Sequence, residues 1–430
     1  MSDLITSQLP VLRSHRLPGL DFGDDLQYPV YDGYSVLNIP SGVCRLLGVP
    51  PLLSPPLADE VLAPLRGEAK RVILILVDGL ALHWLQKWLE AGSLPGWQSL
   101  IERGVLAPLT SIVPSTTSAA LTSLWSGAPP AVHGIAGYEM WLKEYGIVAN
   151  MIEQRPISYQ GKAGHLRMAG FDAGSFLSVG TLGRHLQDHG ISSHAFQHHS
   201  IIHSGLSQMF MDGVESHGFQ TAAELWVKAR KLLEERLDER MYLWVYWGAL
   251  DSLSHYQGPD DESILAEFIH FSQAFEQFFL QRLDEKAKKD TVLLFSADHG
   301  HIRTDPHHHR YQAANHPDLM QRLHILPTGE NRLTYLHVQP GQVEAVREYI
   351  QQTWPDDAVV EDSEFALEQG LFGTGKPHQE MSSRLGDLVV AWRGEAYLWW
   401  APNKRNHLIG RHGGMSPEEM LVPLLGIRLG

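Results

Sequence analysis

Residues 71–92 read RVILILVDGLALHWLQKWLEAG, and the order of elements that they predict decides the fold. The run VILILV has the length and the near-continuous apolar character of a strand that is buried on both faces. Apolar residues then recur at helical spacing until Gly92, a residue typical of helix ends. Strands covered on both faces are typical of parallel sheets, so this stretch predicts one strand–helix unit of such a sheet.

The same alternation recurs twice further along the chain. Residues 221–240 predict a long amphipathic helix before the strand MYLWVYWGA, which begins at Met241. Residues 262–289 predict another long helix before the strand TVLLFSADHG, which begins at Thr291. The repeated units predict an α/β fold with a central, mostly parallel sheet flanked by helices.

Two parts of the chain do not follow this alternation. Residues 1–65 are rich in Pro, Gly and Leu without periodicity, and we expect them to form an N-terminal arm that packs on the core. Residues 320–400 contain TYLHV, GQVEAVREYIQQTW, DLVVAWRG and AYLWWA, which predict a small α+β cap. The core is then expected to consist of residues 66–319 and 401–430, with the cap inserted between them.

Composition argues against several classes of protein. The chain has 34 Lys and Arg against 49 Asp and Glu, a net charge of −15, whereas binding to duplex nucleic acid or to a membrane surface needs clustered basic residues. No run approaches the roughly 18 apolar residues of a membrane span, and the N-terminus lacks the apolar core of a secretion signal. We therefore expect a cytoplasmic protein. The single cysteine, Cys44, excludes an intramolecular disulfide and a thiolate zinc cage.

Polar residues follow three of the predicted strands at the point where each ends. Asp78 follows the first strand, Asp251 the second, and the pair Asp298-His299 the third. Because the carboxyl ends of strands are where sites form in open α/β sheets, we expect these side chains to lie together. Taken alone, Asp78 is equally consistent with the N-cap of the next helix.

Three further motifs extend this set. The hydroxyl cluster 115–118 precedes a predicted helix that Gly127 ends, and it suits either a bound phosphoryl group or simple helix capping. His255 lies four residues after Asp251, so the two converge on one metal ion if the segment is helical. His412 lies among glycines that let the backbone pass close to a crowded site.

Together these motifs supply three aspartates, three histidines and a hydroxyl. This donor set is sufficient for two closely spaced divalent cations, and the absence of thiolates fits zinc or manganese equally. Two such ions can hold the attacking and the leaving oxygen of an in-line displacement.

The motifs resemble the alkaline phosphatase superfamily, and most closely its type I phosphodiesterase/nucleotide pyrophosphatase branch. The resemblance covers roughly residues 70–430, as motifs with unmatched sequence between them. The matching segments are VDG at 77–79, VPSTT…SG…HGI from 113 to 135, Asp251…His255, SADHG at 296–300 and HGG at 412–414.

The resemblance implies an alkaline-phosphatase-like core and two metal sites. One metal would be held by Asp251, His255 and His412, and the other by the following residues: Asp78, Asp298, His299 and the oxygen of the nucleophile. The nucleophile aligns with Thr117, with Thr116 and Ser118 as the alternatives, and it would form a phosphothreonine intermediate. Tyr138 stands where the branch usually has an asparagine that contacts a phosphoryl oxygen, and ordinary aromatic packing is the equal alternative.

We therefore expect a two-metal phosphate-ester hydrolase, most closely a phosphodiesterase or nucleotide pyrophosphatase, that acts on a small phosphate ester or nucleotide. The same site would also serve a phosphomonoesterase, a sulfatase or a phosphonate hydrolase. However, no motif predicts the positively charged side chains that normally bind the extra charge of a monoester. A phosphoglycerate mutase is disfavoured because the interval from Thr117 to Asp251 already has to supply core elements. A non-catalytic metal-binding module is disfavoured because all seven site positions are intact.

Overall fold

The main sheet of the molecule has eight strands in the order β1-β3-β19-β10-β2-β9-β7-β8. A computed structural model describes residues 2–157, 162–304, 310–401 and 406–430. The strands are β1 (Ser2–Asp3), β2 (Arg71–Val77), β3 (Val105–Thr110), β7 (Ser192–His198), β8 (Val214–Phe219), β9 (Met241–Trp247), β10 (Thr291–Ser296) and β19 (Leu421–Arg428). Only β19 runs antiparallel to its neighbours, so the expected mostly parallel α/β sheet is confirmed.

Helices cover both faces of this sheet, as the apolar strands predict. Trp244 of β9 contacts Trp125 on one face, with ring centroids 5.0 Å apart, whereas Trp247 of the same strand contacts Phe271 at 5.0 Å. The helices around the sheet are α4 (Leu82–Glu90), α5 (Pro95–Arg103), α6 (Thr117–Ser126), α9 (Leu182–Asp188), α10 (Gly205–Phe210), α11 (Ala222–Glu235), α12 (Ala249–Gln257), α13 (Glu262–Phe275) and α14 (Glu285–Lys289). Burial on both faces explains why β2 and β9 are apolar throughout.

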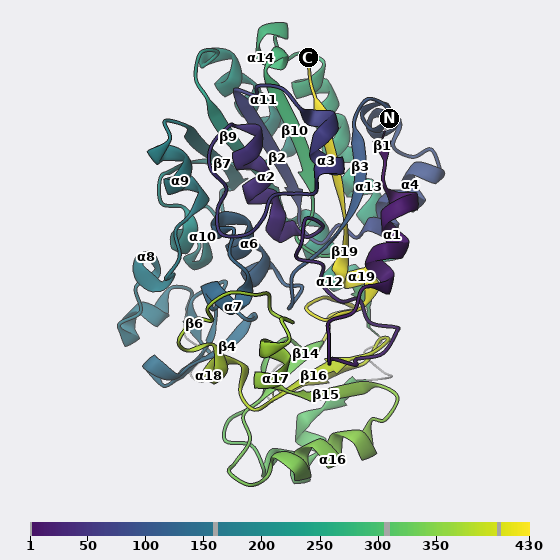
Figure 1. The fold of residues 1–430 in the computed structure, drawn as a ribbon, viewed down its shortest axis with the longest axis vertical. Helices are drawn as coiled ribbons and strands as arrows, with labels where there is room; N and C mark the ends of the chain where they lie inside the picture. The colour runs from purple at the N-terminus through teal and green to yellow at the C-terminus, as the bar shows by residue number, and fades with distance from the viewer. Residues whose placement is uncertain (1, 158–161, 305–309, 402–405) are drawn as a thin grey trace.

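A second, antiparallel sheet of seven strands lies beyond one end of the main sheet (Figure 1). Its strands, in spatial order, are β15 (Ala358–Asp362), β16 (Leu388–Trp392), β14 (Leu333–Leu336), β13 (Thr328–Gly329), β4 (Glu139–Leu142), β5 (Ile147–Asn150) and β6 (Arg155–Pro156). The helices α16 (Val343–Thr353), α17 (Ser363–Glu368) and α18 (Met381–Leu385) belong to this part of the chain. The sheet therefore joins residues 139–156 to the expected cap, 320–400, through the pairing of Gly329 with Glu139.

The N-terminal segment contributes to the cores of both sheets. Its helices α1 (Ile5–Ser14) and α2 (Ile39–Leu46) bury Leu12 and Val43 in the main core. Tyr28 belongs to the apolar cluster under the second sheet. Cys44 is buried, and burial raises the pKa of its thiol to about 12, as suits a residue that packs rather than reacts.

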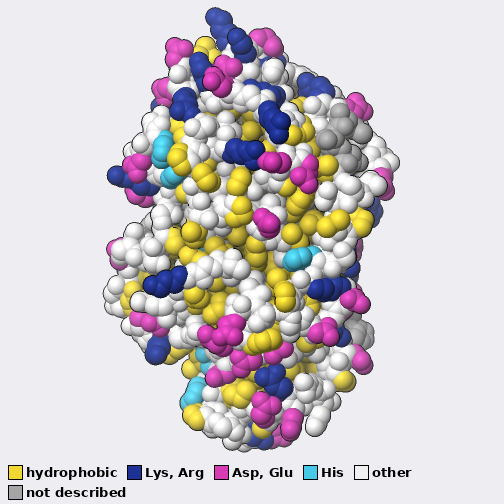
Figure 2. Space-filling model, viewed as in Figure 1, with side chains coloured by type: hydrophobic (Ala, Val, Ile, Leu, Met, Phe, Trp, Pro, Cys, Tyr) yellow, Lys and Arg dark blue, Asp and Glu magenta, His cyan; other side chains and the backbone are white. Residues whose placement is uncertain are grey.

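The surface carries charges of both signs. On the face shown in Figure 2, Lys and Arg are interspersed with Asp and Glu, and apolar side chains gather across the middle. Within the described residues, no helix has the length and apolar character that crossing a membrane requires.

Candidate active site

The three predicted carboxylates meet because their strands are neighbours in register. Val77 of β2 pairs with Trp247 of β9, and Leu76 pairs with Ser296 of β10. Asp78 directly follows β2, whereas Asp251 lies in the first turn of α12 after β9. Parallel strands that end together deliver the residues after them to one edge, which is the arrangement expected from the sequence.

One group of ligand atoms surrounds Asp251. The segment after β9 is helical, so His255 lies one turn further along α12, with its Nε2 3.4 Å from Asp251 Oδ1. The Nε2 of His412 lies 3.5 Å from the same oxygen. A third histidine, His301, is closer, with its Nε2 2.8 Å from Asp251 Oδ1. The structure thus gathers one carboxylate oxygen and three imidazole nitrogens at one point.

A second group lies around His299. Its Nε2 is 3.3 Å from Asp78 Oδ1, 3.6 Å from Asp298 Oδ2 and 3.1 Å from Thr117 Oγ1. All four residues are buried. The rings of His299 and His412 stack with centroids 3.8 Å apart, so the two groups adjoin.

The histidine rings are oriented so that Nε2 faces the site. The Nδ1 atoms of His255, His299 and His412 lie 2.9, 3.0 and 3.2 Å from backbone carbonyl oxygens. A carbonyl only accepts, so each Nδ1 carries the proton and each Nε2 presents a lone pair. This second contact fixes the tautomer that a metal-ligating histidine requires.

The carboxylates need a compensating cation. Burial, together with the charges of Asp298 and Asp251, raises the pKa of Asp78 well above its usual value. Burial and the charge of Asp251 raise the pKa of Asp298 to about 7. One oxygen of each, Asp78 Oδ1 and Asp298 Oδ2, is buried without a hydrogen-bond donor. Buried carboxylate oxygens and imidazole lone pairs at this spacing fit divalent cations.

The hydroxyl cluster turns one oxygen toward this group. Thr116 is the N-cap of α6, and Thr117 begins the helix. Ser115 Oγ donates to the carbonyl of Gly414, and Ser118 Oγ donates to the carbonyl of Gly137. The distance of 3.1 Å from Thr117 Oγ1 to His299 Nε2 therefore distinguishes Thr117 from its neighbours.

Sequence reasoning missed His301. The short strand β11 (Ile302–Arg303) pairs with β18 (Gly410–Arg411), and this pairing brings His301 next to His412. The ring of His301 also stacks on Trp84, with centroids 6.4 Å apart. The spacing of two residues between His299 and His301 could have identified His301 as a site residue, because residues two apart in an extended chain share a face.

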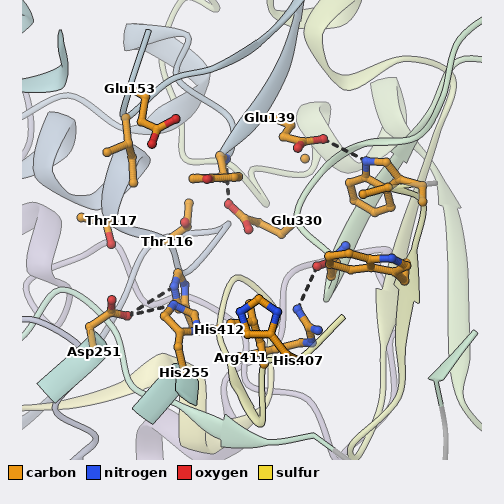
Figure 3. Close-up of a pocket in the computed structure, with 18 of the residues that line it drawn as sticks. Thr116, Thr117, Glu139, Glu153, Asp251, His255, Glu330, His407, Arg411 and His412 are labelled. Atoms are coloured by element: carbon orange, nitrogen blue, oxygen red, sulfur yellow. Dashed lines mark hydrogen bonds and ion pairs between the residues drawn. The ribbon is translucent and has the colours of Figure 1, made fainter. Parts of the chain in front are cut away.

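A pocket of about 640 Å³ opens in front of Thr117. Thr117, Asp251 and His412 line it together with Glu139, Glu153 and Glu330, and Glu330 lies beside Thr116 (Figure 3). Trp399 and Trp400 also line it, and Trp400 Nε1 donates to Glu139 Oε2 over 2.9 Å. The tryptophan pair lies at the end of β17 (Tyr397–Trp399) and the residue after it, so this strand contributes to the pocket wall.

Tyr138, which the sequence analysis named as a candidate substrate contact, lines the same pocket. Burial raises the pKa of its hydroxyl to about 12, so the phenol remains a hydrogen-bond donor at neutral pH. Its backbone N–H donates to Glu330 Oε1 over 2.7 Å. Burial raises the pKa of Glu330 to about 8, and the sequence did not single out this residue.

Arg411 is a second pocket residue that the sequence analysis missed. Its guanidinium lies 4.1 Å from the ring centroid of Tyr397 and 5.5 Å from that of Trp399. It donates to Asn331 Oδ1 over 3.0 Å, and its Nε has no hydrogen-bond acceptor. A buried cation one residue before His412 is therefore available at the pocket wall.

The loop that carries His412 is held by buried polar contacts. Ser416 and Glu419 form a capping box at the start of α19 (Pro417–Met420). Glu419 Oε2 accepts from Arg332 Nη2 over 2.9 Å, and Glu419 Oε1 accepts from the backbone N–H of Gly414 over 2.9 Å. This ion pair links the second sheet to the metal-ligand loop.

Several other histidines lie outside the two groups of ligand atoms. His133 is buried and lies 3.0 Å from Ser123 Oγ, a structural contact beneath the site. Of the other predicted loop histidines, His198 pairs with Ser200 and His203 lies in a turn. Residues 307–309 lie outside the described part of the chain.

Known proteins share this fold and its motifs. A family model described as type I phosphodiesterase/nucleotide pyrophosphatase matches residues 72–415. The chain is similar to murine ectonucleotide pyrophosphatase/phosphodiesterase 5, with 16% identity and a TM-score of 0.60 over 82% of this chain and 87% of that one. A variant of that murine protein, inactive through replacement of a threonine by alanine, is in complex with AMP; it has 16% identity, a TM-score of 0.59 and the same coverage of 82% and 87%.

A phosphonate-cleaving enzyme has the same fold. Phosphonoacetate hydrolase from Sinorhizobium meliloti 1021, in complex with phosphonoformate, has 18% identity and a TM-score of 0.61 over 82% of this chain and 89% of that one. Similarity at these low identities establishes the shared fold but not the substrate of this chain.

Proposed function

Because this chain belongs to the type I phosphodiesterase/nucleotide pyrophosphatase family, and is thus a metal-dependent phosphoric ester hydrolase, we propose that it cleaves phosphodiester or nucleotide pyrophosphate bonds with Thr117 as nucleophile. The observation that carries this proposal is the position of Thr117 Oγ1, 3.1 Å from His299 Nε2 at the start of α6. The hydroxyl is placed between the ligand group and the open pocket.

The proposed ligands form two sets that share an edge of the sheet. Asp251, His255 and His412 would hold one zinc ion, with manganese as the alternative. The other ion would be held by the following residues: Asp78, Asp298, His299 and Thr117. Two bound divalent ions supply positive charge to the attacking and the leaving oxygen of an in-line displacement.

The residues of the chain then account for a two-step transfer. Thr117 Oγ1 attacks phosphorus, the Thr117 O–P bond forms, and the bond to the leaving oxygen breaks. Water hydrolyses the phosphothreonine in the second step and restores the hydroxyl. The amino end of α6 directs unpaired N–H groups and the positive end of its dipole at the phosphoryl oxygens. The inactive threonine-to-alanine variant of the murine relative supports this role for Thr117.

The pocket favours a diester over a monoester. Glu139 and Glu153 line the pocket, and their carboxylates repel the second negative charge of a monoester. The aromatic walls formed by Tyr138, Trp399 and Trp400 offer a flat apolar surface for an organic leaving group or nucleobase. A diester has one charge and two organic groups, which is what these walls accommodate.

Rates on matched substrates test the proposal. With bis(nitrophenyl) phosphate, nitrophenyl phosphate and nitrophenyl sulfate at equal concentration, we expect the diester to give the highest kcat/KM. A higher kcat/KM on the monoester or the sulfate would overturn the diester assignment. After brief reaction with bis(nitrophenyl) phosphate and acid quenching, mass analysis should find a nitrophenyl phosphoryl group on the peptide that contains Thr117, because only one nitrophenolate leaves in the first step.

Phosphonate hydrolysis is the second candidate, and Arg411 is the observation that favours it. A phosphonate that carries a carboxylate needs a cation beside the phosphorus site, and the unbonded Nε of Arg411 is buried at the pocket wall. Release of phosphate from phosphonoacetate faster than nitrophenol from the diester would select this function instead.

A further inference from the structure

A second group of possible metal ligands lies away from the pocket, on the last two strands of the main sheet. His194 of β7 pairs in register with Glu215 of β8, and His217 lies two residues further along β8. Residues two apart on a strand share a face, so all three side chains project from the same face of the strand pair. His194 pairs on its other side with Leu243, toward the amino end of β9, whereas Asp251 lies past the carboxyl end.

The three ligand atoms stand at the spacing of a coordination sphere. His194 Nδ1 is 3.1 Å from His217 Nε2 and 3.4 Å from Glu215 Oε2, and His217 Nε2 is 3.6 Å from Glu215 Oε1. Tetrahedral zinc with bonds of about 2.0–2.1 Å separates its ligands by about 3.3 Å. The corresponding separations between histidine nitrogens and carboxylate oxygens around Asp251 and His299 in the candidate active site are 2.8–3.6 Å.

The surroundings suit a neutral-imidazole site. Burial lowers the pKa of His194 to about 4 and also lowers the pKa of His217, so both rings are uncharged and keep a lone pair at neutral pH. The other nitrogen of His194, Nε2, lies 3.2 Å from Ser192 Oγ, a contact that leaves Nδ1 for a metal.

Access and charge also bear on this group. A recess of about 550 Å³ reaches His194 and Glu215 from the surface. The guanidinium of Arg236, 3.6 Å from Glu215 Oε2, is the neighbouring cation that a metal ion would displace. Its side chain is 34% exposed, so it can swing into solvent when an ion binds.

We propose that His194, Glu215 and His217 form a third metal site, which binds zinc and clips the edge strand β8 to β7. The fourth ligand position faces the recess and is filled by water. The site ties two strands together at the edge of the sheet, where β8 has only one neighbouring strand, so its role is to stabilise that edge.

Zinc content of the full chain tests the proposal. The probe is zinc alone, added in excess and then removed by gel filtration, with bound metal measured by atomic emission. We expect His217→Ala and Glu215→Gln each to bind one zinc equivalent fewer than the unmodified protein. His198→Ala is the matched control, because His198 also lies on β7 but its Nδ1 contacts Ser200 Oγ rather than a carboxylate.

Equal zinc content in all four proteins would overturn the proposal and leave a simple hydrogen bond between His194 and His217. The result is a difference between variants, so it does not depend on how fully the active site is loaded. Hydrolase activity should be unchanged in His217→Ala, whereas the increase in melting temperature that zinc causes should be smaller. An equal increase in both proteins would also contradict the proposal. If the unmodified protein hydrolysed none of the tested substrates, that result would instead contradict the proposed function.

Discussion

The proposed mechanism depends on the hydroxyl group of Thr117. Thr117→Ala should keep the fold, because a hydroxyl at a helix start contributes typically about 1 kcal/mol as a cap. It should remove most turnover, because the first chemical step loses its nucleophile. Thr117→Ser should retain part of the rate, since the attacking oxygen survives and only rotamer restriction is lost. Steady-state kcat on a nitrophenyl diester measures the turnover of both variants, and the melting temperature of Thr117→Ala measures whether the fold is kept.

Neighbouring hydroxyls provide the control for this experiment. Ser118 donates to the carbonyl of Gly137, away from His299, so Ser118→Ala should keep near-normal turnover. If Ser118→Ala or Thr116→Ala were inactive while Thr117→Ala stayed active, the nucleophile would be one residue away from Thr117. Activity in all three would show that water attacks phosphorus directly.

His301 should tune the metal site next to it. Its Nε2 lies 2.8 Å from Asp251 Oδ1, so it holds the carboxylate that the first metal would use. Loss of such a supporting contact typically weakens metal affinity by about 10- to 100-fold. We expect His301→Ala to need correspondingly more zinc for half-maximal activity, with kcat restored at saturating zinc. An unchanged zinc requirement would show that Asp251 is held adequately without it.

Residue identity at the site could be predicted where a strand ends and not where a loop folds back. Asp78, Asp251 and Asp298 follow buried strands, and a shared sheet edge brings them together without further information. His301 and Arg411 depend on the two-residue pairing of β11 with β18. Such short pairings leave no periodic pattern in the sequence, so these positions needed the structure.

At the scale of elements, the ion pair between Arg332 and Glu419 fixes the loop before α19. Glu419→Gln should leave the buried guanidinium of Arg332 without its charge partner, and breaking a buried pair costs roughly 3–5 kcal/mol. It also weakens the contact to the N–H of Gly414, two residues after His412. We expect a lower melting temperature and a raised zinc requirement together, both measured on the same preparation.

The matched control keeps the helix and changes only the cap. Ser416→Ala removes the side chain that caps α19 but leaves the pair of Arg332 with Glu419 in place. It should cost about 1 kcal/mol and leave the zinc requirement unchanged. If both variants changed the zinc requirement equally, the cap rather than the ion pair would position His412.

The tryptophan-lined rim should set substrate preference. Trp399 and Trp400 reach the pocket at the end of β17, which pairs with β12 (Arg310–Gln312) in a separate two-stranded sheet. Trp399→Ala should therefore raise KM for a diester with large aromatic groups more than for a dimethyl ester, because only the larger substrate reaches the rim. Equal changes for both substrates would show that Trp399 supports the fold alone.

The elements of the main sheet follow from the sequence more directly than those of the second. The strands β2, β9 and β10 are long apolar runs, each preceded or followed by a periodic helix. The strands β4 and β5 have four residues each and pair with each other, and β4 joins the rest of the second sheet through Glu139, which pairs with Gly329 almost two hundred positions away. Local patterns carry little information about such distant pairing.

For the whole molecule, bound metal should be a large part of stability. Three carboxylates and four imidazoles converge within the buried site, and without cations the carboxylates repel one another. Dialysis against EDTA should therefore abolish activity and lower the melting temperature, and zinc or manganese should restore both. Full activity after exhaustive chelation would contradict a two-metal mechanism.

The effect of chelation should grow with pH. Burial raises the pKa of Asp298 from 3.8 to about 7 in the metal-free protein, so the folded state holds a proton that the unfolded chain has released. The stability from that proton is present below pH 3.8 and is lost as pH rises through about 7. Bound cations compensate the ionised carboxylates and remove this loss.

The pKa of Glu330 is raised by burial to about 8, and this group titrates in the zinc-loaded and in the chelated protein. Its contribution therefore cancels in the difference between their melting temperatures. The gap in melting temperature between the zinc-loaded and chelated protein should therefore widen from about pH 5 to pH 8. Asp298→Asn should reduce the slope of the chelated form, and the remaining slope belongs to Asp78, whose pKa burial also raises. A gap that stays constant across this range would show that Asp298 is ionised in the metal-free protein as well.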